Sequence, residues 1–172
     1  MMMKILAEGG LPVVSDRQRS PDMDNPNGYF ELERVKYMSA GNVAWLADAG
    51  GKAVKIISAL LEFLPSNYVY RVIFMEREIQ EIMESQRKML EHRNETSRVD
   101  EAHIEEQLRK HLGLVKPWLA RQPNMEALYI SYNALLSNPE PSCRRVMEFI
   151  RLPLDLEGML SVPDGNLYRS HM

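Results

Sequence analysis

The chain has one cysteine, no long apolar run and no excess of basic residues. A lone Cys143 makes an intrachain disulfide impossible, and a reducing, cytoplasmic setting fits this content. A membrane-spanning helix needs about 20 consecutive apolar residues, so we expect no membrane partner. The 21 Lys and Arg against 24 Asp and Glu give a net charge of -3. This balance argues against a general nucleic-acid binder but permits a local basic pocket for a small anion.

Metal-ligand spacing is also missing, because the four histidines are scattered along the chain and Cys143 stands alone. We therefore expect no metal site. The 172 residues, of which 45% are hydrophobic, suffice for one domain with a sizeable core. We find no internal repeat or linker, so the sequence predicts a single domain over residues 1–172.

Short apolar runs alternate with helical patterns along the chain. The clearest buried strand is Tyr70–Met75, and other strands are expected at 11–14, 52–58 and 127–131. Helical patterns lie at 1–10, 29–38, 60–64, 79–90, 100–119, 141–150 and 155–160, with a loop at 15–28 and a break at 94–98. Strands separated by helices are typical of βαβ units. We thus predict a three-layer α/β fold, with a mainly parallel sheet and helices on both faces.

An anion site is expected where the strand at 70–75 meets the next helix. Ligands of open parallel sheets bind beyond the carboxyl ends of the strands, and helix N-termini favour negative charge. Arg77 stands at this turn and is able to hold a phosphate bidentately, while Ser85 follows about two helical turns later. The alternative is that Arg77 only pairs with a nearby glutamate and Ser85 is an ordinary helical serine.

Several segments together resemble the sulfotransferase superfamily. VIFMERE at 72–78 with SQR at 85–87 is similar to the family's 3′-phosphate-binding segment, although Glu78 replaces the usual Asp. The stretch ISYNALLSNPE at 130–140 resembles a Tyr-Glu-Asp-Leu…Asn-Pro-Glu segment, with Asn133 in place of an acid. DNPNGYFE at 24–31 and LYR at 167–169 are similar to parts of bacterial relatives.

The resemblance implies the donor 3′-phosphoadenosine 5′-phosphosulfate (PAPS) and a role for five residues. Arg77, Ser85 and Arg169 would bind the donor's 3′-phosphate. Glu31 would act as the general base, and Lys55 would neutralise charge on the sulfuryl group, although Ile57 stands where relatives carry a histidine. The alternatives are that Glu31 is a solvated glutamate of a first helical turn and that Lys55 is an ordinary strand-edge lysine.

The family's opening strand and glycine-rich phosphosulfate loop have no counterpart in the sequence, and Met1–Leu6 resembles the helix that follows the loop. We therefore expect an N-terminally truncated, P-loop-type domain whose first strand is missing. By the resemblance, that strand would lie between 54–57 and 72–75. Neighbouring strands sit about 4.8 Å apart, so its loss would leave a slot of about twice that width with open edges. Poor stability or aggregation is the expected consequence.

The function implied by the resemblance is sulfuryl transfer from PAPS to a hydroxyl or amine of a small-molecule, glycan or peptide acceptor. A truncated chain without catalysis, binding nucleotide weakly or not at all, is the alternative. A nucleotide kinase of related fold is a third possibility, disfavoured because kinases need a complete Walker-type loop and a Mg²⁺ site. The sequence does not identify the acceptor or the oligomeric state.

Overall fold

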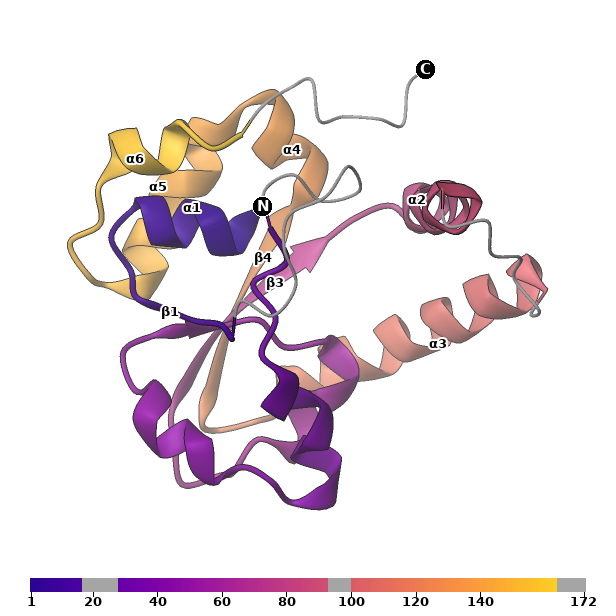
Figure 1. Cartoon of the computed structure of the whole chain (residues 1–172), viewed down its shortest axis with the longest axis horizontal. Coiled ribbons are helices and arrows are strands. Elements are labelled where there is room, and N and C mark those ends of the chain that lie inside the picture. The colour runs from indigo at the N-terminus through magenta and orange to yellow at the C-terminus, as the bar shows by residue number, and fades with distance from the viewer. Residues whose placement is uncertain (17–27, 93–99, 164–172) are drawn as a thin grey trace.

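The computed structural model describes residues 1–16, 28–92 and 100–163, so most of the expected loop at 15–28 and the whole break at 94–98 lie outside the described residues. The protein is a mixed α/β structure with short parallel sheets (Figure 1). In chain order, its elements are α1 (Met2–Glu8), β1 (Val13–Val14), the 3₁₀ helices η1 (Glu33–Ala40) and η2 (Ala44–Ala49), β2 (Ala53–Val54), the 3₁₀ helix η3 (Ser58–Phe63), β3 (Tyr70–Glu76), α2 (Ile79–His92), α3 (Glu101–Leu119), β4 (Met125–Ser131), α4 (Tyr132–Ser137), α5 (Pro139–Ile150) and α6 (Leu156–Leu160).

Side-chain caps explain where three of the helices begin. Asp100 accepts a hydrogen bond from the Ala102 N–H (3.2 Å) at the start of α3, and Asp155 accepts one from the Glu157 N–H (3.0 Å) at the start of α6. The Ser131 hydroxyl accepts from the Ala134 N–H (3.3 Å) and so starts α4 directly after β4. These caps satisfy amide groups that the helix itself leaves unpaired. The helices expected from Asp100 and Asp155 are confirmed, whereas α4 was missed.

The segments before β3 differ most from the sequence expectation. The helical patterns at 29–38 and 60–64 form the 3₁₀ helices η1 and η3, and the strand expected at 52–58 shrinks to β2. A strand ladder is only as long as its partner allows. The partner β1 follows Pro12, which has no N–H, and ends before Ser15 and Asp16, which both bond to the Glu31 carbonyl oxygen at 3.1 Å. The chain thus turns away after two residues of pairing.

Two separate two-stranded sheets are present among the described residues. β1 pairs with β2 and β3 pairs with β4, and both pairs are parallel, as expected. The β3–β4 ladder is the longer, running from the Tyr70↔Met125 pair to the Glu76↔Ser131 pair. The single sheet that we expected is therefore divided between β2 and β3.

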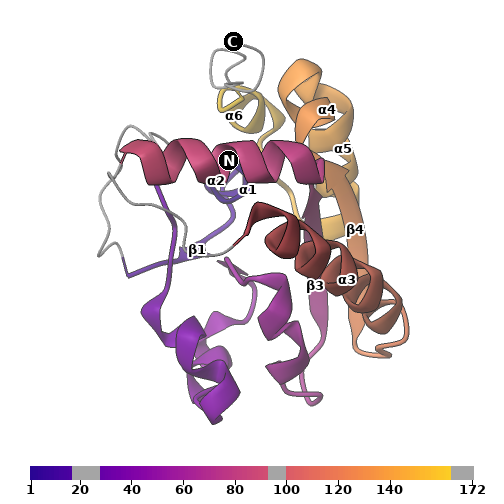
Figure 2. The ribbon, with the colours of Figure 1, turned by 90° about the vertical axis from the view of Figure 1, so that its right-hand side faces the viewer.

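The strands lie between two apolar cores, one on each face. One core holds Ile5, Ile130, Leu135, Val146 and Met159 and joins α1 with α4, α5 and α6. The other is formed by η1, η2, η3 and α3, and it contains Phe74, Leu119, Trp45 and Leu46. Figure 1 shows α1, α4, α5 and α6 above the strands and the 3₁₀ helices below, while Figure 2 shows α2 and α3 side by side.

No helix of the described ranges combines the length and apolar content of a membrane span.

Helix α1 is fixed against α6 by a close backbone approach. The Asp155 N–H donates to the Gly9 carbonyl oxygen at 3.0 Å, and a Cβ added at Gly158 would collide with the Glu8 carbonyl oxygen. Glycine is the residue that leaves room for such an approach. This contact holds the end of α1 against the start of α6.

The packing of α3 predicts that two of its leucines contribute very differently to the free energy of unfolding. Leu119 is 0% exposed and Leu114 is 64% exposed. Leu119→Ala should lower the free energy of unfolding by about 2–5 kcal/mol because it opens a cavity in the core, whereas Leu114→Ala should change it by about 0.5 kcal/mol or less. Urea unfolding followed by circular dichroism measures both. Equal losses in the two variants would contradict the observed placement of α3.

Candidate functional site

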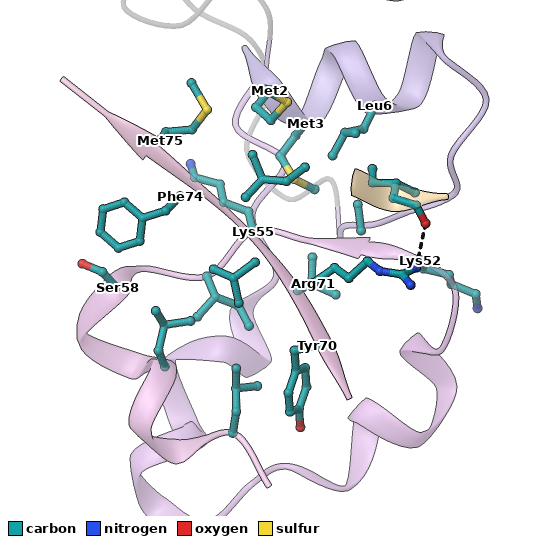
Figure 3. A pocket seen from close by; sticks show the side chains of 18 of the residues that line it. Met2, Met3, Leu6, Lys52, Lys55, Ser58, Tyr70, Arg71, Phe74 and Met75 are labelled. Atoms are coloured by element: carbon teal, nitrogen blue, oxygen red, sulfur yellow. Dashed lines mark hydrogen bonds between the residues drawn. The ribbon is translucent and has the colours of Figure 1, made fainter. Parts of the chain in front are cut away.

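A cavity of about 720 Å³ lies between β2 and β3 (Figure 3). Its walls are residues 52–56 around β2 and residues 70–77 along β3. Met2, Met3 and Leu6 of α1 close one side, and side chains of η3 and α3 contribute to another. The cavity reaches the carboxyl ends of β2 and β3, which is where open parallel sheets place their ligands.

Lys55 follows β2 directly and lies beside Glu31. The Lys55 Nζ donates to the Tyr29 carbonyl oxygen at 3.1 Å and lies 3.7 Å from a Glu31 carboxylate oxygen. Both side chains are about two-fifths exposed, at 41% and 42%. Lys55 lines the cavity, and in Figure 3 it points toward the end of β3 that carries Phe74 and Met75. The two residues expected to be catalytic are therefore neighbours at the cavity, although Glu31 itself does not line it.

The amino group of Met1 lies near Lys55 and Lys4. Burial, followed by repulsion from Lys55 and Lys4, lowers the pKa of this amino group.

Arg77 follows β3 and is held by partners from two helices. Its Nε lies 3.2 Å from a carboxylate oxygen of Glu81 on α2, and its guanidinium carbon lies 4.9 Å from the centre of the Tyr132 ring on α4. The second Glu81 oxygen accepts a hydrogen bond from the Asn133 side-chain amide at 2.8 Å. An acid at position 133 would repel Glu81, so the departure of Asn133 from the family pattern fits this arrangement. The alternative expectation, that Arg77 pairs with a nearby glutamate, is met by Glu81.

The other two expected donor-binding residues are less closely associated with the cavity. Ser85 is exposed on α2 and does not line the cavity. A helix rises 1.5 Å per residue, so a ligand that joins the start of α2 to Ser85 must extend along the helix by about 9 Å. Arg169 lies outside the described residues.

Two polar pairs at the cavity were missed in the sequence. Lys116 of α3 forms an ion pair with Glu76 at the end of β3 and lies over the rings of Phe74 and Tyr129, 6.0 and 5.6 Å from their centres. A second pair joins the Ser58 hydroxyl to the His111 Nε2 at 2.8 Å; Ser58 lines the cavity. Neither pair has a sequence signal, because its members are 40 and 53 residues apart on unrelated elements.

Three cationic side chains of this site are each paired with a carboxylate. Lys55, Arg77 and Lys116 each lie beside a carboxylate, namely Glu31, Glu81 and Glu76 respectively. The described residues contain no group of three or more His, Cys, Asp or Glu placed to hold a metal ion. An anion that enters this site would bind to cationic side chains that already have carboxylate partners. It would either bind beside the carboxylate or replace it.

A comparison with protein families matches residues 27–156, more than half of the chain, to the sulfotransferase family. The chain belongs to the sulfotransferase family. Members of this family generally use PAPS as the donor. The matched range includes Glu31, Lys55, Arg77 and Ser85, whereas Arg169 lies beyond it. Neither the curated proteins nor the solved structures gave a match.

For this member of the family, the geometry predicts that the Glu31 side chain contributes little to the stability of the fold. Its ion pair with Lys55 is long and two-fifths exposed, and such pairs typically contribute between about 0 and 1 kcal/mol. Glu31→Gln should therefore change the free energy of unfolding by less than about 1 kcal/mol. Urea unfolding of the two proteins measures it. A loss of several kcal/mol would assign the side chain to the fold and remove the reason to seek a chemical role for it.

Proposed function

We propose that this sulfotransferase transfers a sulfuryl group from PAPS to a hydroxyl or amine acceptor. The observation that carries the proposal is the placement of Lys55 and Arg77 on one cavity, after two successive strands of the family-matched range. A three-layer sheet of the P-loop type and a cytoplasmic setting complete the proposal, supported by cores on both faces of the strands and by the single cysteine.

The proposed reaction moves one group and one proton. The acceptor oxygen or nitrogen attacks the sulfur of PAPS, the bond between the sulfur and the 5′-phosphate oxygen breaks, and adenosine 3′,5′-bisphosphate leaves. Glu31, which lies 3.7 Å from Lys55, takes the acceptor's proton as general base. Lys55 also offsets the negative charge that develops as the sulfuryl group moves.

Donor binding is assigned to the carboxyl end of β3. Arg77 would contact the 3′-phosphate, with Ser85 and Arg169 as further ligands of the same group. The Tyr132 ring and Glu81 hold the guanidinium in place before any ligand arrives. This pre-organisation reduces the entropy that is lost on binding. The acceptor is a small molecule, glycan or peptide.

The first test is ligand-induced stabilisation. At about one hundred times its dissociation constant, a ligand stabilises the folded chain by about 2.7 kcal/mol, which raises the melting temperature by about 5–10 °C. We expect adenosine 3′,5′-bisphosphate to do so in a thermal-shift assay and ATP with Mg²⁺ to have no comparable effect. Stabilisation by ATP with Mg²⁺ alone would favour a nucleotide kinase.

A matched arginine pair locates the site. Arg77→Ala should weaken bisphosphate binding by about tenfold or more, since charged hydrogen bonds contribute about 1.5–3 kcal/mol. Arg144→Ala is the control, because Arg144 also pairs with a glutamate one helical turn away but lies on α5, away from the cavity. Isothermal titration calorimetry measures both. Equal affinities for the two variants would remove Arg77 from the donor site.

A second pair of variants separates the two ends of the donor. If Lys55 faces the sulfuryl group, Lys55→Met should weaken the binding of PAPS more than that of adenosine 3′,5′-bisphosphate, whereas Arg77→Ala should weaken both. Lys36→Met is the control and should alter neither affinity, because Lys36 also pairs with a glutamate but does not line the cavity. If Lys55→Met and Lys36→Met have the same effect on PAPS, Lys55 has no role at the sulfuryl group.

A further inference from the structure

Three elements meet around one carboxylate at the carboxyl ends of β3 and β4. Arg77 directly follows β3, Glu81 lies in the first turn of α2, and Asn133 lies in the first turn of α4. Figure 2 shows the start of α2 beside α4 and the end of β4. The Glu81 carboxylate is therefore within reach of side chains from both neighbouring elements.

The two oxygens of Glu81 have partners on different elements. The Arg77 Nε lies 3.2 Å from one oxygen, and the Asn133 side-chain amide donates to the other at 2.8 Å. The Glu81 side chain is only 15% exposed, and a carboxylate so shielded from water is costly to keep unless its oxygens are hydrogen-bonded. Asn133 thus supports the carboxylate that pairs with Arg77.

This ion pair differs from two other arginine–glutamate pairs that are one helical turn apart. In the Arg109–Glu105 and Arg144–Glu140 pairs, the glutamate side chains are 35% and 53% exposed. An exposed pair of this kind competes with water and holds its arginine weakly. Glu81 is less exposed and is also bonded from a second element, so it is able to hold its arginine in one orientation.

The orientation of the Asn133 amide is set by the same carboxylate. Its oxygen Oδ1 is buried and accepts no hydrogen bond from the described residues. A buried acceptor without a donor costs free energy. The opposite orientation would turn Oδ1 toward the Glu81 oxygen, and two acceptors repel each other. The amide therefore donates to Glu81 although its own oxygen is left unsatisfied, whereas an acid at position 133, as in the family pattern, could not donate at all.

We propose that Asn133 and Glu81 are positioning residues of the donor site. Asn133 holds the Glu81 carboxylate, which together with the Tyr132 ring fixes the Arg77 guanidinium so that it meets the 3′-phosphate in one orientation. No chemical step passes through either residue. The inference rests on the proposed donor site and adds that one amide on α4 controls how well this site recognises the 3′-phosphate.

The test compares two ligands that differ by one phosphate group. Adenosine 3′,5′-bisphosphate carries the group assigned to Arg77, and adenosine 5′-phosphate lacks it. In isothermal titration calorimetry, the unchanged protein should bind the bisphosphate more tightly by about tenfold or more. Equal affinities, or no binding of either ligand, would overturn the proposed donor site and this inference with it.

Asn133→Leu removes the amide but keeps the size of the side chain and the charge of the site. It should weaken bisphosphate binding by about two- to tenfold, because Arg77 then loses conformational freedom only when the ligand binds. The affinity for adenosine 5′-phosphate should stay the same. An equal loss for both ligands would assign the side chain to the fold alone. That result, or no loss for either ligand, would overturn the positioning role but not the donor site.

An exchange of the amide and the carboxylate separates positioning from net charge. Asn133→Asp places two carboxylates together and should weaken bisphosphate binding by about tenfold or more. Adding Glu81→Gln to this variant again pairs one amide with one carboxylate and should restore most of the affinity. Glu81→Gln alone should have little effect, because the Asn133 amide is able to turn its oxygen to the new amide. If Glu81→Gln raises the affinity equally in both backgrounds, only net charge matters and the proposal fails.

Ala134→Asp is the matched control for an added charge. Ala134 is exposed and follows Asn133 on α4, so a carboxylate there would be hydrated. It should weaken bisphosphate binding by about fivefold or less, and Glu81→Gln should not rescue it specifically. If Ala134→Asp weakens binding as much as Asn133→Asp does, and Glu81→Gln rescues both, position 133 has no special role and the proposal fails.

Discussion

The parallel pairing of β3 with β4 is the constraint on which most of the structure depends. Its two strands are apolar on both faces, and each face supplies one of the two cores. The register also builds the donor end of the site. Because Glu76 pairs with Ser131, the next residues along the two strands, Arg77 and Tyr132, leave the sheet side by side. The cation–π contact at 4.9 Å follows from this register. A slip of one residue would separate them and exchange the faces of the strand.

An anionic ligand at the cavity would compete with protein carboxylates for the same cationic side chains. Lys55 and Glu31 are separated by 3.7 Å and well hydrated, so an anion displaces this contact at little cost. Arg77 and Glu81 are less exposed, at 25% and 15%, and Glu81 is further held by Asn133. The Lys55 end is thus the adaptable part of the site, and the Arg77 end is the pre-organised part.

The sequence predicted the long elements, because periodicity and capping are local. The strand at Tyr70–Met75 and the helix after Asp100 are of this kind. The 3₁₀ helices before β3 were not predictable as such, since their form depends on how η1 and η3 pack together. The Lys116–Glu76 and Ser58–His111 pairs were out of reach for the same reason. Each joins elements that only the fold brings together, and no single-residue pattern marks the partner.

Lys55 and Arg77, at the two ends of the site, follow strands of different sheets. The distance between them is therefore not fixed by hydrogen bonds between neighbouring strands. Lys55 extends β2, Arg77 extends β3, and the described residues contain no ladder that joins the two strands. Their separation is then set by helix packing and by whatever lies in the cavity between them. Hydrogen-bonded strands, in contrast, are held about 4.8 Å apart. The distance between the sulfuryl and phosphate ends of the proposed donor site therefore depends on how the helices around the cavity pack, and not on hydrogen bonds between the two strands.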